Sequence, residues 1–222
     1  MRYCDECLKT ASRSLLLLPR LRAWLSPVDA PRQADLIFVL AGKVRRKEYA
    51  LELSRQGLAP RILLSVGRFE IRRFSKMALP ASLDLLKLAQ AVPPPQRHYF
   101  VYFEGEEVRT QYVRPGRFGT LTEIDALARW LRENPDIRSV LVVSSDSHLR
   151  RIRMCCRSLL NGNVQLAFLA APHSPSEQPA PATSEQQEDH PPQEESSGFA
   201  SAKEDLLELC KLAIYWALLK IR

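Results

Sequence analysis

Residues suited to binding an anion follow three short apolar runs of the chain. The segments that follow these runs are Ala41-Gly42-Lys43-Val44-Arg45-Arg46, Gly67-Arg68 with Arg72 and Arg73, and Ser144-Ser145-Asp146-Ser147-His148-Leu149-Arg150-Arg151. Glycine lets backbone amides approach a ligand closely, and the guanidinium group of arginine matches the oxygens of phosphate or carboxylate. We therefore expect Gly42 and Gly67 to allow close approach, and Arg45, Arg46 and Arg151 to bind the anion.

His148 and Glu123 are the candidate catalytic residues. His148 stands three residues before Arg151, so a helix beginning near Ser147 places both on one face, and an imidazole exchanges protons near neutral pH. Thr120 and Glu123 match a helix capping box, which is a purely structural role. The alternative is that Glu123 faces the strand ends and orients His148 or an arginine, or binds a ligand hydroxyl.

Two other motifs have the residue types of a functional site but not the arrangement that it requires. Cys4 and Cys7 have the spacing of a metal knuckle, but no second such pair follows, so no metal site is expected. The stretch 144–148 contains serine, aspartate and histidine, yet sequence neighbours rarely converge as a catalytic triad and no nucleophile-elbow motif is present. The odd count of five cysteines fits a reducing compartment.

The elements that must position these residues alternate between strand and helix. Charge-free apolar runs predict strands at 36–40, 62–66, 99–103 and 140–144, with a weaker one at 164–169. Helical spacing predicts helices at 47–56, 82–91 and 121–133, and another after the fourth strand through Leu149, Ile152, Cys156 and Leu159. This order predicts a doubly wound α/β fold with a mainly parallel sheet of about five strands, in which ligands bind outside the carboxyl ends of the strands.

The chain divides into a body and three flanking parts. We expect an N-terminal helical segment at 1–33, a single domain at 34–171, a disordered acidic and proline-rich loop at 172–200 and a docking helix at 201–222. The expected docking side chains have helical spacing: Leu206, Leu209, Ala213, Trp216 and Leu219.

Charge is unevenly distributed. The net charge is +7, but 172–200 carries six acidic residues and no Lys or Arg, so the remainder has 32 basic and 19 acidic residues, or +13. A body this basic attracts anions. The longest apolar stretch near the start, Leu15–Leu18, is far short of the roughly 20 residues of a membrane span, so we expect a cytoplasmic protein.

Several of these segments together resemble the YdcF-like family, which includes the SanA-like and ElyC-like proteins. They are ADLIFVLAG at 34–42, RQGLAP at 55–60, Ser65-Val66-Gly67, Gly119-Thr120 with Glu123 and Ala126, and VLVVSSDSHLRR at 140–151. The resemblance implies a Rossmann-like fold, an anionic or nucleotide-like ligand at the strand ends and, for some members, a link to bacterial envelope biogenesis. It assigns site positions to Gly42, Arg45 or Arg46, Ser65, Gly67, Thr120, Glu123, His148 and Arg151. This chain departs from the family pattern at Ala41, Val66, Ile124 or Asp125, and Ser147.

The leading hypothesis is a protein that binds a phosphorylated or nucleotide-like small molecule, with Ser144 and Ser145 as further ligand contacts. It acts as an enzyme if His148 transfers a proton and Glu123 orients it. The rival is a non-catalytic regulatory module that holds the same ligand. Nucleic-acid binding is a weaker alternative, because aromatic side chains are not interleaved with the basic clusters. The sequence identifies no cofactor.

Overall fold

A single α/β sheet of six strands forms the centre of the molecule. The computed structural model describes residues 24–67, 70, 98–105, 107–114, 116, 119–160, 162, 164–172 and 194–221, with 194–205 as helical backbone. The strands are β1 (Leu36–Val39), β2 (Arg61–Val66), β3 (Tyr99–Glu104), β4 (Glu107–Tyr112), β5 (Ser139–Ser144) and β6 (Gln165–Ala170). The helices are α2 (Val44–Arg55), α4 (Gly119–Glu133), α5 (Leu149–Leu159) and α6 (Glu194–Ile221), and a 3-10 turn, η3 (Asp146–His148), precedes α5.

The sheet is mixed. Its strand order is β4-β3-β2-β1-β5-β6, in which β2, β1, β5 and β6 are parallel and β3 and β4 are antiparallel additions at one edge. The prediction that 99–103 is another parallel strand is therefore wrong. β3 runs backwards beside β2 and turns at Gly105, whose φ of 57° favours glycine, into β4. β4 was missed because it is a polar, mostly exposed edge strand without an apolar run.

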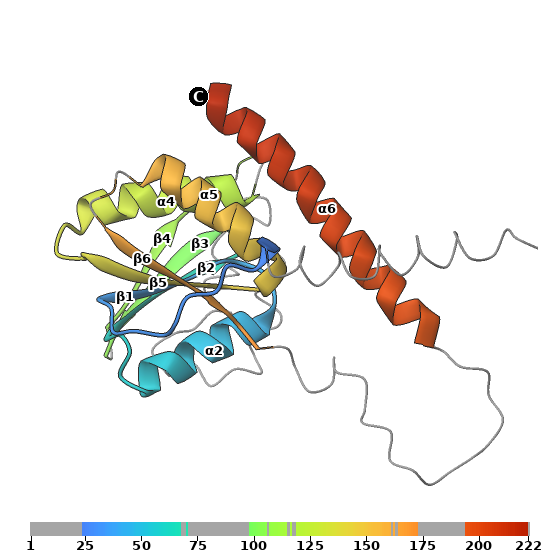
Figure 1. Ribbon diagram of the computed structural model, residues 1–222. Coiled ribbons are helices and arrows are strands. Elements are labelled where there is room, and N and C mark those ends of the chain that lie inside the picture. Colours follow the sequence, from blue (N-terminus) through green and yellow to red (C-terminus); the bar gives the residue numbers. More distant parts are fainter. Residues whose placement is uncertain are drawn as a thin grey trace, which may run out of the picture.

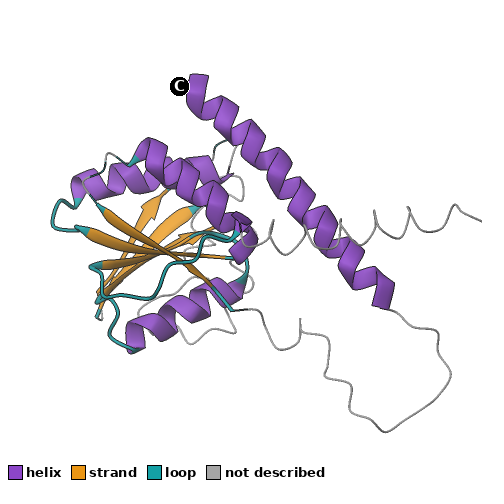
Figure 2. Cartoon of the chain, in the orientation of Figure 1, coloured by secondary structure: helices purple, strands orange, loops and turns teal. Residues whose placement is uncertain are grey.

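Helices cover both faces of the sheet (Figures 1 and 2). All four residues of β1 are buried, and alternate side chains point to opposite faces. Phe38 contributes to the core beneath α4 and α5, whereas Val39 contributes to the core beneath α2, where Ala50 and Leu53 of the helix are buried. All five predicted strands and three of the predicted helices in the body thus form close to the expected positions, although β3 runs in the opposite direction.

Helix α6 lies across α5. Of the five predicted docking side chains, Leu219 packs against the core, Leu209 is half-buried, and the other three are exposed. Glu208, Leu212 and Tyr215 are the buried residues of α6, whereas Leu206 and Trp216 are 62% and 59% exposed. The helix also begins at Glu194, inside the segment 172–200 that was expected to be a loop. α6 carries apolar residues on most sides, so helical spacing by itself could not select the docking face.

Some expectations lie outside the described residues. These include the helix at 82–91, residues 1–23 of the N-terminal segment and residues 173–193 of the acidic segment. Residues 26–33 of the N-terminal segment, predicted to be helical, contain neither helix nor strand. Within the described ranges, no helix combines the length and apolar character that a membrane crossing requires.

Candidate functional site

A cavity of about 330 Å³ lies at the edge of the sheet where β1, β5 and β6 end. The residues that follow these strands line it together with one side of α6: Lys43, Arg45, Arg46, Ser145, Asp146, Ser147, His148, Ala171, Pro172, Leu207, Glu208 and Lys211. Parallel strands end at the same edge, so segments far apart in the sequence meet here. Four predicted site residues, Arg45, Arg46, Ser145 and His148, line this cavity.

Helix α2 begins at the cavity without an acidic side chain in its first turn, whereas η3 begins with Asp146, whose Oδ1 accepts a hydrogen bond from the N–H of Ser147. Lys43 precedes α2 and Ser145 precedes η3, and neither side chain caps its helix by a hydrogen bond. The amino end of a helix carries a partial positive charge, which an acidic or capping side chain would normally offset. Basic side chains at the amino end of α2 therefore add to a field that favours a negative ligand.

Arg46 joins the ends of β1 and β5. Its Nη1 donates to the carbonyl oxygen of Ala41 at 2.7 Å, and its Nε donates to Ser145 Oγ at 3.0 Å. Gly42 makes this possible, because a Cβ there would lie 2.7 Å from Arg46 Nη1 and its φ of 135° disfavours other residues. Burial lowers the pKa of Arg46, with Glu123 and Glu70 opposing this effect. The guanidinium remains charged at neutral pH, so Arg46 both supports the site and contributes its positive charge.

His148 and Arg151 meet a carboxylate that comes from α6. Glu208 Oε1 lies 3.1 Å from His148 Nδ1 and 2.8 Å from Lys211 Nζ, and Glu208 Oε2 lies 2.5 Å from Arg151 Nη1. Glu208 is only 3% exposed. Burial opposes its ionisation, but hydrogen bonds from His148 and Lys211 and the nearby positive charges lower its pKa to about 2. The anion held by Arg151 is thus part of the chain itself, a contact that the sequence analysis missed.

Two groups contact the same nitrogen of His148. Glu208 Oε1 lies 3.1 Å from Nδ1, and Arg151 Nη2 lies 3.4 Å from it. The closer carboxylate favours a proton on Nδ1, and His148 is part of the cavity lining. The sequence analysis assigned the role of orienting His148 to Glu123. In the structure the carboxylate that contacts His148 belongs to Glu208.

Glu123 forms a second polar cluster behind the cavity. Its Oε1 accepts hydrogen bonds from the N–H of Ala41 at 2.8 Å and from the hydroxyl of Ser65. His98 Nε2 lies 2.9 Å from Ser65 Oγ and 3.8 Å from Glu123 Oε1. Burial raises the pKa of Glu123, but the hydrogen bonds from His98, Ser65 and Ala41 outweigh it, so the net shift is downward. The carboxylate thus ties strand ends to α4 instead of forming the predicted capping box with Thr120.

His98 reaches this cluster because β3 is antiparallel. It directly precedes β3, and pairing of Tyr99 with Val66 brings the start of β3 to the edge where β2 ends. A parallel strand would have placed His98 at the opposite edge. Ser65 donates its proton to Glu123 and is fully buried, so Ser65, His98 and Glu123 do not form a nucleophilic triad. The only sequence signal for His98 was a histidine directly before an apolar run.

A buried ion pair supports the turn after β1. Lys47 Nζ, fully buried, lies 2.5 Å from Glu70 Oε2, and Glu70 Oε1 accepts a hydrogen bond from the N–H of Gly42. Burial raises the pKa of Glu70 and lowers that of Lys47. Gly67 lies against this pair, since a Cβ there would be 3.3 Å from Glu70 Oε1. The sequence analysis missed both charged residues.

The remaining predicted positions are not part of the lining that the described residues define: Gly42, Ser65, Gly67, Thr120, Glu123, Ser144 and Arg151. Thr120 hydrogen-bonds to Tyr215 of α6. Ser144 is fully buried, and within the described part of the chain its hydroxyl has no hydrogen-bond partner. The predicted residues thus divide into those that line the cavity and those that build its supports.

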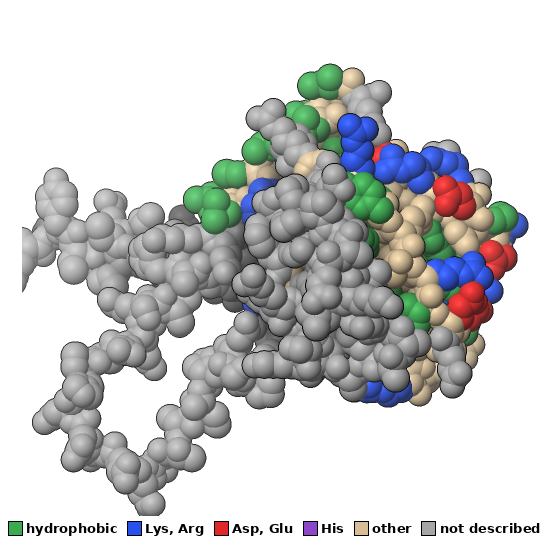
Figure 3. Space-filling model, turned by 180° about the vertical axis from the view of Figure 1, so that it is seen from behind, with side chains coloured by type: hydrophobic (Ala, Val, Ile, Leu, Met, Phe, Trp, Pro, Cys, Tyr) green, Lys and Arg blue, Asp and Glu red, His purple; other side chains and the backbone are tan. Residues whose placement is uncertain are grey.

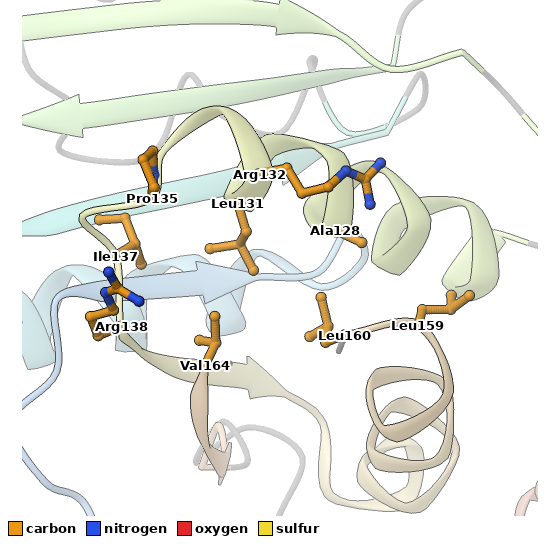
Figure 4. A pocket seen from close by; sticks show the side chains of 9 residues that line it. All are labelled: Ala128, Leu131, Arg132, Pro135, Ile137, Arg138, Leu159, Leu160 and Val164. Carbon is orange, nitrogen blue, oxygen red and sulfur yellow. The ribbon is translucent and has the colours of Figure 1, made fainter. Parts of the chain in front are cut away.

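A second cavity, of about 270 Å³, differs in character (Figure 4). Apolar side chains line it, with Leu131 of α4 and Val164 pointing toward each other and Arg132 and Arg138 at its sides. It lies near the starts of β5 and β6, away from the edge to which the sequence motifs lead. We therefore treat the cavity at the strand ends as the candidate site.

Two of the three cysteines in the described residues, Cys155 and Cys156, are buried, and Cys210 is exposed on α6. The described residues contain no group of three or more His, Cys, Asp and Glu side chains placed to hold a metal ion, and Cys4 and Cys7 lie outside them. Burial raises the pKa of the Cys155 thiol to about 12, which leaves it protonated and unreactive.

Comparison of this chain with known protein families, with curated proteins and with solved structures gave no match. The functional argument therefore rests on the geometry of the site.

Proposed function

We propose that this chain binds a phosphorylated or nucleotide-like anion in the cavity at the ends of β1, β5 and β6. The charge of the lining carries the proposal. Five side chains supply positive charge or an imidazole: Lys43, Arg45, Arg46, His148 and Lys211. They face two carboxylates, and Glu208 is already held by Lys211, His148 and Arg151. Asp146 is the other carboxylate, so an incoming anion meets a net positive surface.

The connections of the sheet support this placement. β1 lies between β2 and β5 in the sheet. Helix α2, which follows β1, packs on one face of the sheet, and helix α5, which follows β5, packs on the other face. Where the connections diverge in this way, a Rossmann-like doubly wound sheet has a crevice outside its carboxyl ends that receives ligands. The cavity lies at this crevice, between the segments that follow β1 and β5. The proposed link to envelope metabolism rests on the family resemblance alone.

Whether binding leads to turnover depends on His148. With the proton on Nδ1 beside Glu208, the neutral imidazole can accept a second proton at Nε2. This arrangement favours general acid–base chemistry and supports the enzyme hypothesis. The alternative is a regulatory module in which the same histidine only donates a hydrogen bond to the anion.

Titration calorimetry with pyrophosphate and with ADP, at a constant ionic strength of about 150 mM, tests the binding proposal. Replacing one cation in Lys43→Gln or Arg45→Gln should weaken binding about tenfold, which corresponds to about 1.4 kcal/mol. Arg55→Gln is the matched control, because Arg55 is an exposed residue in the last turn of the same helix. No saturable binding of either probe, or an equal loss in the control, would contradict the proposal.

His148→Gln distinguishes the enzyme from the binding module. For an enzyme, phosphate release from either probe should fall about a hundredfold while calorimetry still detects binding. For a binding module, the unmodified chain releases no phosphate and affinity changes only modestly. The weaker nucleic-acid alternative predicts a different result, namely affinity for any duplex that falls linearly with the logarithm of salt concentration.

A further inference from the structure

A groove outside the candidate site runs along helix α5. It consists of two hollows, one of about 420 Å³ between α5 and α6 and one of about 640 Å³ between α5, residues 29–32 and β6. Arg153 and Arg157 line both hollows, so the two adjoin, and we call them together the α5 groove. Among the described residues, the α5 groove shares no lining side chain with the cavity at the strand ends. It is therefore a separate surface.

Positive charge dominates the α5 groove. Arg150, Arg153 and Arg157 are separated by three and four residues, which places them in a row on one side of α5. Arg32 lines the second hollow, and Asp29 is the one carboxylate in the described lining. Asp29 Oδ2 already accepts hydrogen bonds from Arg153 Nη2 at 2.6 Å and from a backbone N–H of β6 at 2.9 Å. Four guanidinium groups and one carboxylate leave a net positive lining that attracts an anion.

The three arginines of α5 lie close enough to repel one another. Burial lowers the pKa of Arg150, and the charges of Arg153 and Arg157 lower it further. Within the described part of the chain, Arg153 is the member of the row that pairs with a carboxylate. Negative charges spaced along the row relieve the repulsion between the guanidinium groups. This favours an anion with several charges over a single carboxylate or phosphate.

Two tryptophans from opposite ends of the chain border the first hollow. Trp24 is 49% exposed, and Arg150 lies over its ring, 3.8 Å from the ring centre. Trp216 is 59% exposed on α6, whose hydrophobic side chains follow the edge of the molecule in Figure 3. An exposed indole ring is a flat face on which a nucleobase stacks. The sequence analysis found no interleaving of aromatic and basic side chains, because only the fold brings these tryptophans to the arginine row.

The shape of the α5 groove selects among anionic partners. In a single nucleic-acid strand, phosphates are spaced along the backbone and every base has a face that stacks on an aromatic ring. Such an extended ligand matches two adjoining hollows. A membrane surface suits the exposed apolar side chains of α6, but it is flat, whereas Arg150 and Arg153 are half-buried within the hollow. The groove therefore fits a strand better than a lipid surface.

We propose that the α5 groove binds single-stranded nucleic acid, with phosphates on the arginine row and bases stacked on Trp24 and Trp216. Stacking does not depend on which base is present, so little sequence preference is expected. Because this groove and the cavity at the strand ends have separate linings, binding of a strand is independent of the small anion proposed above.

Fluorescence anisotropy measures the binding, with a fluorescein-labelled oligothymidylate of about 15 nucleotides titrated with the whole chain between about 20 and 200 mM salt. Trp216→Ala should weaken binding about tenfold, the size of one lost stacking contact. Arg157→Gln should weaken binding and lower the slope of log affinity against log salt concentration by about 0.7, the value for one phosphate of a single strand. Both side chains are exposed, and an unchanged circular dichroism spectrum verifies that the variants fold.

Two control variants and two other probes complete the test. Arg55→Gln and Tyr112→Ala remove an exposed arginine and a 47% exposed aromatic ring elsewhere on the surface, and both should leave the affinity nearly unchanged. A duplex of the same length should bind more weakly than the single strand, because its bases are already stacked.

Four results would overturn the proposal. They are the absence of saturable binding at low salt, an equal loss of affinity in a control, and a duplex that binds as tightly as the single strand. The fourth is a loss of affinity in Lys43→Gln but not in Arg157→Gln, which would place the strand in the cavity at the strand ends. Binding of anionic lipid vesicles that depends on Trp216, without binding of the oligonucleotide, would also overturn it by identifying a membrane as the partner.

Discussion

Replacement of Glu208 by glutamine tests whether the ion cluster between α6 and the cavity holds the helix in place. Glu208 is almost fully buried and contacts His148, Arg151 and Lys211. Its pKa is lowered from 4.5 to about 2. At about 1.4 kcal/mol for each tenfold change in an ionisation constant, this corresponds to about 3 kcal/mol in favour of the ionised form. Glu208→Gln should therefore lower the free energy of unfolding by about 3 kcal/mol at pH 7.

The sign of the pH dependence follows from the same shift. Glu208 ionises more readily in the folded chain than in the unfolded chain, so its contribution is fully present above about pH 4.5. It is lost as the pH falls from about 4.5 to about 2, where both states become protonated. The difference in free energy of unfolding between the unmodified chain and Glu208→Gln should accordingly shrink over this interval.

Urea unfolding followed by circular dichroism between pH 2 and pH 7 measures this difference. Glu133→Gln is the matched control, because Glu133 is exposed on α4, and its effect should stay within about 0.5 kcal/mol. A Glu208→Gln effect below about 1 kcal/mol at pH 7, or one that does not change with pH, would refute the reasoning. It would show that the cluster is no stronger than a surface ion pair.

Three further changes test other parts of the fold. Gly42→Ala should lower the free energy of unfolding, measured by thermal denaturation, by about 1–3 kcal/mol, because the added Cβ would contact Arg46 and the φ of Gly42 is 135°. Gly119→Ala is the control and should leave stability unchanged, because an added Cβ there has nothing within 4 Å. Asp35→Ala should lower the urea midpoint by the equivalent of about 1–3 kcal/mol, since its carboxylate accepts two backbone N–H groups and a hydroxyl at the start of β5; an unchanged midpoint would contradict this. Deletion of 203–222 should cause aggregation in gel filtration, because it uncovers the buried surface beneath Tyr215; a monomeric product with an unchanged melting temperature would show that α6 is not docked.

The strand ends of the parallel part of the sheet could be predicted because burial on both faces leaves a clear pattern. Runs such as 36–40 and 140–144 have no charge and end abruptly at polar residues. Once two such strands are parallel, their carboxyl ends must meet, so the convergence of Arg45, Arg46, Ser145 and His148 on one cavity follows from local pattern alone. Predicting that these residues meet therefore required no knowledge of contacts between distant parts of the sequence.

The partners of these residues could not be predicted in the same way. Glu208 reaches His148 and Arg151 from about 60 positions further along the chain. In the sequence, nothing distinguishes it from Glu204 and Asp205, the acidic residues shortly before it. His98 reaches Ser65 only because β3 runs antiparallel, which its apolar sequence does not encode. Pairings across such distances depend on the direction of a strand or the rotation of a helix, and neither leaves a local periodicity.

By itself, the sequence determined that an alternating α/β body forms and that basic and small polar residues gather where its parallel strands end, because periodicity and burial act locally. Tertiary structure decided that two antiparallel strands extend the sheet, which moves His98 to the site edge. It also decided the rotation of α6. This helix is apolar on most sides, and the side that docks carries Glu208, Leu212 and Tyr215, so the packed core and the positive charge beside Glu208 select the face together.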